Sequence, residues 1–157
     1  MSTTLQNNDI ILQPLTSADA GRYYQLYNTL YAVDSPFLPN ETAEGFTLRI
    51  INACNFIWSI RLKTDPETII GDCALHDQDE KVQEIEIGGS LFPGHQGKNI
   101  MYQAFELILE FVKNELKLKA IIGKTTSQNI PAIKLVQKLG FSIIHTNDAE
   151  VILRKTF

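Results

Sequence analysis

Residues 91–100, LFPGHQGKNI, decide how this chain folds. An apolar run ends at Pro93, Gly94 and Gly97 follow, and a long helical pattern begins directly behind them. A helix that starts behind a glycine-rich turn has several N–H groups without intrahelical partners and a partial positive charge at that end. Phosphate is a natural ligand for such a terminus. The stretch therefore predicts a phosphate-binding turn, and the alternative is an ordinary strand-to-helix turn.

Two familiar phosphate-binding motifs do not match this turn. A Walker A loop needs GxxxxGK followed by Ser or Thr. Here Phe92 stands in place of the first glycine, and Asn99 follows Lys98. The dinucleotide motif GxGxxG is absent as well. Any phosphate site in this turn must therefore be of another kind.

The segment behind the turn, MYQAFELILEFVKNEL (101–116), has the spacing of an amphipathic helix. Its apolar residues recur every three or four positions, which places them on one helix face. They are Met101, Ala104, Phe105, Ile108, Phe111, Val112 and Leu116.

The remaining patterns predict an α/β fold with a mixed sheet. The expected strands are 9–15, 56–62, 68–76, 84–92 and 119–126, and the chain ends in a hairpin over 141–155. The other expected helices are 16–31, 41–54 and 129–140. The order β-α-α-β-β-β-α-β-α-β-β favours helices on both faces of one sheet. Strands 84–92 and 119–126 flank a helix, so we expect them to be parallel with a right-handed crossover. We expect one domain over residues 1–157.

The composition excludes several classes of protein. The net charge is -4 and no basic run occurs, which weighs against nucleic-acid binding. Cys54 and Cys73 are far apart, and no CxxC or HExxH occurs, so we predict free thiols and no metal site. The N-terminus has no signal-peptide pattern, and no apolar run approaches about 18 residues. We therefore expect a cytoplasmic protein without membrane contact.

The glycine turn, with QNIPAIKLVQKLGF (128–141) behind it, resembles the GNAT superfamily of acetyl-CoA-dependent N-acetyltransferases. That superfamily carries Q/R-x-x-G-x-G/A before its third helix, and later an Asn followed by a helix that ends in K-x-G-F. EIGGSLFPGHQGKNI (86–100) is similar to the RimJ/RimL type, which acetylates the N-termini of ribosomal proteins. IILQPLTSADA (10–20) and WSIRLKTDPETIIGDCAL (58–75) fit the early strands of that type.

The resemblance implies a site for acetyl-CoA, the acetyl-donor cosubstrate. Its pantetheine arm would lie between strands 84–92 and 119–126, which splay apart; a bulge at Gly88 and Gly89 would cause the splay, unless these glycines only weaken the strand. Asn129 would face the thioester region or merely cap its helix. The implied contacts are the main chain of Leu91 and Phe92 for the arm, and the amides of His95, Gln96, Gly97, Lys98, Asn99 and Ile100 for the pyrophosphate. The Lys98 side chain would add charge near a phosphate or simply be solvated.

Acetyl transfer also needs a base that accepts a proton from the amine. We predict Glu86 for this role, with Glu84 as second choice and a structural glutamate–lysine pair as the alternative. The acid that many relatives use is missing, because Val136 and Ala132 occupy the places of their tyrosine and serine. Water or a tyrosine from elsewhere would have to serve, the candidates being Tyr23, Tyr24, Tyr27 and Tyr31.

Within the turn, Gly94 replaces the usual Gln or Arg and Asn99 replaces the second Gly or Ala. Asn tolerates the left-handed backbone better than most residues, so we expect the turn to keep its shape. Residues 22–50 and the turn after strand 68–76 are expected to select the acceptor. Trp58 is expected in the core. His76 could contact an acceptor, but a single histidine at the end of a strand usually has no functional role.

The resulting hypothesis is an enzyme, an N-acetyltransferase that joins acetyl-CoA and a primary amine in a ternary complex. The acceptor is a protein N-terminus, a polyamine, an aminoglycoside or another small amine. The alternative is a non-catalytic acyl-CoA-binding or sensing domain that kept the turn and lost the acid. The expected state is a monomer or a homodimer.

Overall fold

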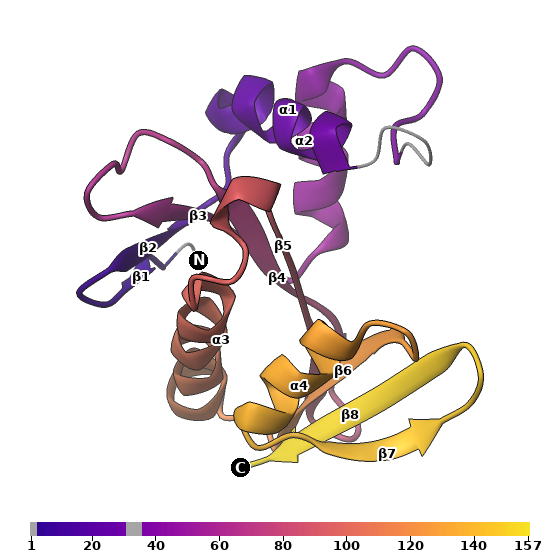
Figure 1. Ribbon diagram of the computed structural model, residues 1–157. Coiled ribbons are helices and arrows are strands. Elements are labelled where there is room, and N and C mark those ends of the chain that lie inside the picture. The colour runs from indigo at the N-terminus through magenta and orange to yellow at the C-terminus, as the bar shows by residue number, and fades with distance from the viewer. Residues whose placement is uncertain (1–2, 31–35) are drawn as a thin grey trace.

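The computed structural model describes residues 3–30 and 36–157 (Figure 1). Its strands are β1 (Leu5–Gln6), β2 (Ile10–Pro14), β3 (Phe56–Leu62), β4 (Gly71–Asp79), β5 (Glu84–Leu91), β6 (Ala120–Thr126), β7 (Ser142–Thr146) and β8 (Glu150–Thr156). Its α-helices are α1 (Ala20–Leu30), α2 (Ala43–Ala53), α3 (Ile100–Phe111) and α4 (Ile130–Lys138). Short helical turns are η1 (Ser17–Asp19), η2 (Pro93–His95) and the π-turn η3 (Val112–Leu116). Tyr31, the last residue of the predicted helix 16–31, lies outside the described residues.

The strands form one sheet in the order β1-β2-β3-β4-β5-β6-β8-β7. β5 and β6 are parallel, as the strand–helix–strand pattern predicts, and the other neighbours are antiparallel. The predicted mixed sheet is therefore confirmed. The sequence missed β1, because a strand of two residues is too short to show a period.

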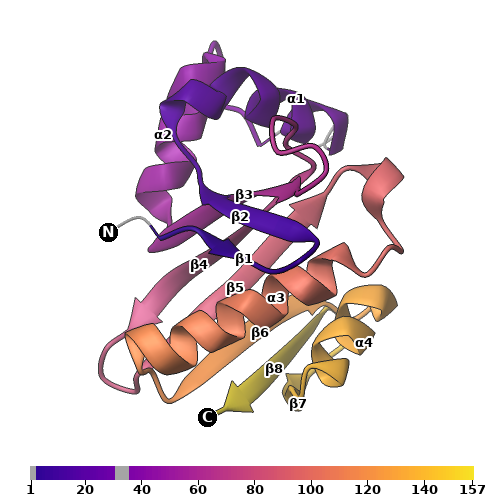
Figure 2. The ribbon, with the colours of Figure 1, turned by 90° about the vertical axis from the view of Figure 1, so that its left-hand side faces the viewer.

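Helices cover both faces of the sheet (Figures 1 and 2). On one face, the buried stripe of α3 packs with alternate strand residues such as Trp58 and Ile60. On the other face, α1 and α2 enclose a second cluster that contains Tyr23, Phe46 and Ile57. Ile57 and Trp58 are neighbours that point in opposite directions, as the period of two in a strand requires. The prediction of helices on both faces is confirmed.

The parallel strands separate halfway along β5. They pair from Glu84 opposite Ala120 to Ile87 opposite Gly123, and no further. β5 then stays with β4 as far as Leu91, while β6 continues along β8. A gap therefore opens between β5 and β6 on the side where α3 begins.

The prediction of a bulge at Gly88 and Gly89 is wrong. Both glycines continue the regular register with β4, and the irregularity lies between His76 and Asp79. Gly89 has a packing role instead, because an added Cβ would lie 2.9 Å from both the Asp72 carbonyl oxygen and the Met101 methyl carbon. The strands separate without a bulge in β5.

Candidate functional site

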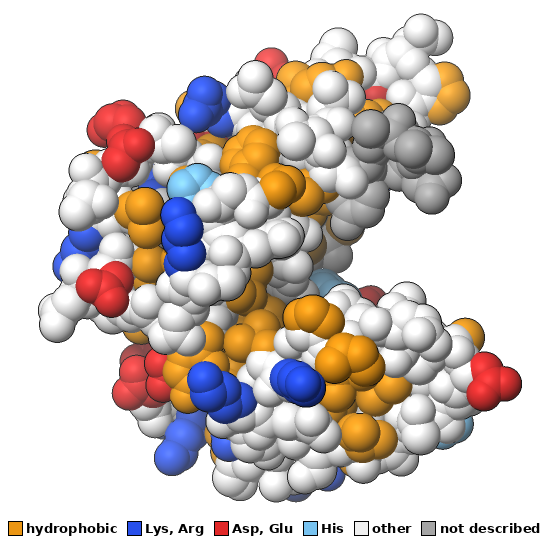
Figure 3. Space-filling view, viewed as in Figure 1, with side chains coloured by type: hydrophobic (Ala, Val, Ile, Leu, Met, Phe, Trp, Pro, Cys, Tyr) orange, Lys and Arg blue, Asp and Glu red, His pale blue; other side chains and the backbone are white. Residues whose placement is uncertain are grey.

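A cavity of about 270 Å³ fills the gap between the separated strands. Figure 3 shows the molecule hollowed between the half that carries α1 and α2 and the half that carries α4. The cavity wall comes from β5, β6, α3 and α4, and it includes Gly88, Gly89, Met101, Lys124, Asn129, Ala132 and Val136. The site thus lies where the chain departs from regular pairing.

The start of α3 presents a run of unpaired amides. Within the described part of the chain, the N–H groups of residues 97–102 have no hydrogen-bond acceptor. The first amide that bonds back is that of Gln103, which donates to the Asn99 carbonyl at 3.3 Å. Unpaired amides at a helix N-terminus carry partial positive charge, so this end of α3 attracts anions.

Two of the amides predicted to bind the pyrophosphate already donate hydrogen bonds within the chain. The N–H of His95 donates to the Phe92 carbonyl at 2.9 Å, and that of Gln96 donates to the Pro93 carbonyl at 3.4 Å. Both bonds belong to η2, which the sequence did not reveal. The run of available amides is therefore shifted by two residues, from 95–100 to 97–102.

Two residues in left-handed conformation shape this turn. Gly97 has φ of 76° and Asn99 has φ of 64°. The expectation that Asn99 accepts the backbone normally given to glycine is confirmed, since asparagine is among the residues that tolerate it. The sequence singled out Gly94 as well, but its φ is not positive and no atom lies within 4 Å of an added Cβ.

A groove of about 530 Å³ runs in front of these amides. Five predicted residues line it beside the turn, namely Leu91, Gln96, Gly97, Asn99 and Ile100, and Asn129 lines it from the start of α4. Lys134 and Lys138 on α4 also line it and add positive charge to the groove. Neither lysine is among the residues predicted from the sequence, although their spacing of four places them on one helix face. Lys98 and His95 do not line the groove.

The main chain of β5 offers bonds toward the gap at Leu91 but not at Phe92. The N–H of Phe92 donates to the Ile70 carbonyl at 2.9 Å, and its carbonyl accepts from His95. Successive main-chain groups of a strand point to opposite edges. Those of Leu91 therefore face the side from which β6 has diverged, whereas the main-chain groups of Phe92 already have partners.

Asn129 caps α4, as one of its two interpretations proposed. Its Oδ1 accepts from the Ala132 amide at 3.3 Å, and its Nδ2 donates to Thr125 Oγ1 at 3.0 Å. It also lines the cavity, together with Ala132 and Val136. The two positions where relatives carry serine or tyrosine therefore do face the cavity, and here they make its wall apolar.

Glu86 lies on β5 beside the cavity, with its side chain 16% exposed. Its Oε1 is 2.5 Å from Lys124 Nζ, and its Oε2 is 3.3 Å from His76 Nδ1. The bond to Glu86 raises the pKa of Lys124. Glu84, the second choice, pairs with Arg154, whose Nε lies 2.7 Å from Glu84 Oε1. Glu86, not Glu84, is thus the carboxylate near the cavity.

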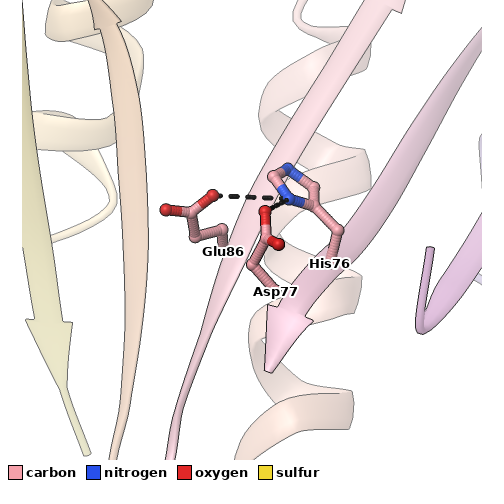
Figure 4. Close-up of side chains that lie close together, drawn as sticks. All are labelled: His76, Asp77 and Glu86. Carbon is pink, nitrogen blue, oxygen red and sulfur yellow. Dashed lines mark hydrogen bonds and ion pairs between the residues drawn. The ribbon is translucent and has the colours of Figure 1, made fainter. Parts of the chain in front are cut away.

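His76 and Asp77 join Glu86 in one cluster that the sequence did not predict (Figure 4). His76 Nδ1 lies 2.7 Å from Asp77 Oδ2, and this hydrogen bond lowers the pKa of Asp77. One ligand atom from each of the three residues lies within 4.8 Å of the others, a spacing that a cation can bridge. The Lys124 ammonium already neutralises Glu86, however, so we assign no metal and the absence of one stays a prediction.

Asp72 is buried behind the site, on β4. Tyr27 donates to its Oδ2 at 2.7 Å and Tyr23 donates to the same oxygen at 2.9 Å. Burial raises the pKa of Asp72, and burial beside Asp72 raises the pKa of Tyr23. The Tyr23 hydroxyl is thus buried on Asp72, and Tyr23 does not line the cavity. Cys73 is buried, Cys54 is half-buried and both are free thiols, as predicted.

A parallel strand pair separates beside an amide-rich helix N-terminus, and this arrangement is that of an acetyltransferase fold. The chain belongs to the GNAT acetyltransferase family, because the model of the acetyltransferase (GNAT) domain matches residues 9–142. Across the residues that the structure describes, none of the helices has both the length and the apolar character needed to cross a bilayer.

Individual relatives are distant. The chain is 32% identical over 84 residues to an uncharacterized N-acetyltransferase p20 from Bacillus licheniformis. The aligned part is 54% of this chain and 47% of the relative. The chain thus matches about half the length of that curated relative. Ribosomal-protein-S5-alanine acetyltransferase from Vibrio fischeri has a TM-score of 0.79 at 17% identity, over 98% of this chain and 96% of that one. The microcin C7 self-immunity acetyltransferase MccE, solved with acetyl-CoA and AMP, has a TM-score of 0.78 at 20% identity, over 96% of this chain and 94% of that one.

Proposed function

We propose that this protein transfers the acetyl group of acetyl-CoA to a primary amine. The run of unpaired amides at residues 97–102, directed at a groove that leads into the strand gap, carries this proposal. A diphosphate matches those amides in charge and hydrogen-bonding capacity. Membership of the GNAT family supports acetyl-CoA as the donor, and the MccE structure contains that molecule.

Acetyl-CoA would lie along the groove with its pyrophosphate at the start of α3 and its thioester in the cavity. The pyrophosphate would bind the amides after Gly97, with Lys134 and Lys138 on the opposite wall. The pantetheine arm would follow β5 as an added strand does, taking main-chain bonds from Leu91. The thioester would then lie in the cavity beside Gly88 and Asn129.

The reaction places modest demands on side chains. A neutral amine attacks the thioester carbonyl once both are held together, and proximity supplies much of the rate. A base must take a proton from the amine. Glu86, next to the cavity and joined to His76 and Lys124, is proposed to belong to this proton-transfer machinery.

The acceptor is proposed to be a protein N-terminus, as in the RimJ/RimL type. The sequence similarity in residues 86–100 and the fold of the ribosomal-protein-S5-alanine acetyltransferase support this class. The second candidate function is a non-catalytic acyl-CoA sensor. The apolar residues Ala132 and Val136 in the cavity wall favour it, because they leave that wall without an acid for the thiolate.

Two measurements test the proposal. Calorimetry with acetyl-CoA and with CoA should show binding of both, and a chain that ignores both at millimolar concentration would refute the site. Turnover of acetyl-CoA is then measured with an alanyl peptide, spermidine and an aminoglycoside. Turnover with any of them supports the enzyme, and binding without turnover supports the sensor. Glu86→Gln should keep acetyl-CoA binding and lose turnover.

A further inference from the structure

The cluster of His76, Asp77 and Glu86 holds the histidine in one orientation. Asp77 Oδ2 and Glu86 Oε2 both face His76 Nδ1, at 2.7 and 3.3 Å (Figure 4). Ionised carboxylates only accept hydrogen bonds. Nδ1 therefore carries the proton, and in the neutral ring the lone pair is on Nε2.

Nε2 lies next to Gly88, a residue of the cavity wall. An added Cβ on Gly88 would be 3.7 Å from His76 Nε2, and Gly88 is part of the cavity wall. The register explains this position, because His76 lies opposite Glu86 and Ala74 lies opposite Gly88. His76 and Gly88 are thus diagonal neighbours across the strand pair, and diagonal neighbours are within reach of a long side chain.

The irregular end of β4 brings Asp77 to the ring. In a regular strand, the side chain after His76 would point to the opposite face of the sheet. Asp77 instead has φ of 52°, at the register shift between His76 and Asp79. A bulge of this kind re-aims a side chain, and here it places the Asp77 carboxylate on the same nitrogen that Glu86 faces.

Both oxygens of Glu86 already have partners, since Oε1 bonds Lys124 and Oε2 faces the ring. Of the side chains in this cluster, His76 keeps a lone pair, on Nε2 beside Gly88 of the cavity wall. Resting on the proposed acetyl transfer, we infer that His76 Nε2 is the proton acceptor of the reaction, and that Asp77 and Glu86 are positioning residues that orient the ring and stabilise its cation.

The two substrates would then meet from opposite faces of the sheet. His76 shares its face with Ala74, which packs against the α1 and α2 cluster, whereas the groove for the donor lies at α3 and α4. The amine nitrogen forms its bond to the thioester carbonyl carbon, and the C–S bond breaks. The amine proton passes to Nε2, the CoA thiolate takes a proton from water, and the imidazolium returns its proton to water. The products are the acetamide and CoA thiol.

The test compares His76→Asn with the wild type, using acetyl-CoA and an alanyl peptide or spermidine, whichever the wild type acetylates. Asparagine keeps an N–H near the position of Nδ1 and removes Nε2. We expect kcat to fall about 100-fold or more, the usual contribution of a general base. The calorimetric affinity for acetyl-CoA should not change. His145→Asn, on the exposed strand β7, is the matched control and should keep full turnover.

Chemical rescue separates catalysis from a structural role. His76 is one-third exposed, so free imidazole can enter the space that His76→Ala leaves. Added imidazole should restore part of the turnover of His76→Ala and none of that of Glu86→Gln. Gly88→Ala fits sterically at 3.7 Å and should lower kcat by covering Nε2.

Each outcome decides the inference. Full turnover in His76→Asn, or a loss in His76→Ala that imidazole does not restore, would overturn the role of His76 and leave the proposed function intact. A wild-type chain that binds acetyl-CoA but acetylates no amine would refute the enzyme itself, and the role of His76 with it.

Discussion

The hydroxyl of Tyr27 lies 2.7 Å from Asp72 Oδ2, and this bond ties helix α1 to the middle of the sheet. Tyr23, one helical turn earlier, donates to the same oxygen at 2.9 Å. Asp72 lies opposite Ser90, the residue before Leu91, in the pairing of β4 with β5. One buried carboxyl thus connects helix α1 with β4, the strand that pairs with the one proposed to hold the pantetheine arm.

Removal of either hydroxyl should destabilise the protein. Tyr23→Phe and Tyr27→Phe each take a donor from a buried carboxyl, and such a loss costs about 1 to 3 kcal/mol. The measurement is the free energy of unfolding in urea. Tyr24→Phe is the control, because Tyr24 is on the same helix and stacks on Phe37 instead; its effect should stay within about 0.5 kcal/mol. Equal stability of the Tyr24, Tyr23 and Tyr27 variants would contradict the network.

Asp72 should also make stability depend on pH. Burial raises its pKa in the native state, and the hydrogen bonds from Tyr27 and Tyr23 offset this only in part. The unfolded chain has an Asp pKa of about 3.9. The native state therefore binds the proton more tightly than the unfolded chain does. The contribution of protonated Asp72 to the free energy of unfolding is fully present below about pH 3.9 and is lost as the pH rises through the raised native pKa.

We therefore expect the wild type to lose stability relative to Asp72→Asn as the pH rises from about 4 to about 8. Asparagine does not titrate, so the difference between the two free energies of unfolding isolates this one group. Urea unfolding of both proteins at several pH values measures it. A difference that stays constant or changes in the opposite direction would show that Asp72 titrates normally in the native state.

Local patterns predicted most of the fold. Helix α3, the cap of α4 at Asn129 and the left-handed Asn99 all depend on residues within a few positions of one another, and each is confirmed. The parallel pairing of β5 and β6 follows from the handedness and length of a single crossover. Such features are encoded by neighbours in the sequence, so a sequence reveals them.

The parts that were missed depend on distant or irregular contacts. Asp77 reaches His76 only because a non-glycine residue has φ of 52°, which no residue pattern announces. The bond from Tyr27 to Asp72 joins residues 45 positions apart. The amides of His95 and Gln96 are lost to a short helical turn that nothing in the glycine spacing required. Long-range packing decided these cases, and a single sequence does not show it.

Asn99 should tolerate glycine and not a β-branched residue. Its φ of 64° is favourable for glycine and costs a β-branched residue about 1 to 3 kcal/mol. Asn99→Gly should keep the stability and the acetyl-CoA affinity of the wild type, whereas Asn99→Val should lower both. Thermal unfolding and calorimetry test the pair. If Asn99→Val binds acetyl-CoA normally, the left-handed turn is not needed to present the amides.

The lysines of α4 should contribute to donor binding more than Lys98 does. Lys134 and Lys138 line the groove in front of the amides, and Lys98 does not. Exposed charge pairs are worth about 0.2 to 1 kcal/mol each, so Lys134→Gln and Lys138→Gln should each weaken acetyl-CoA binding by about 1.5-fold to fivefold.

The effect should shrink at high salt, because salt screens exposed charges. Calorimetry at low and high ionic strength measures it, with Lys81→Gln, in the turn between β4 and β5, as a control of equal charge. A larger loss in Lys98→Gln than in the two α4 variants would move the phosphates to the outer side of the turn.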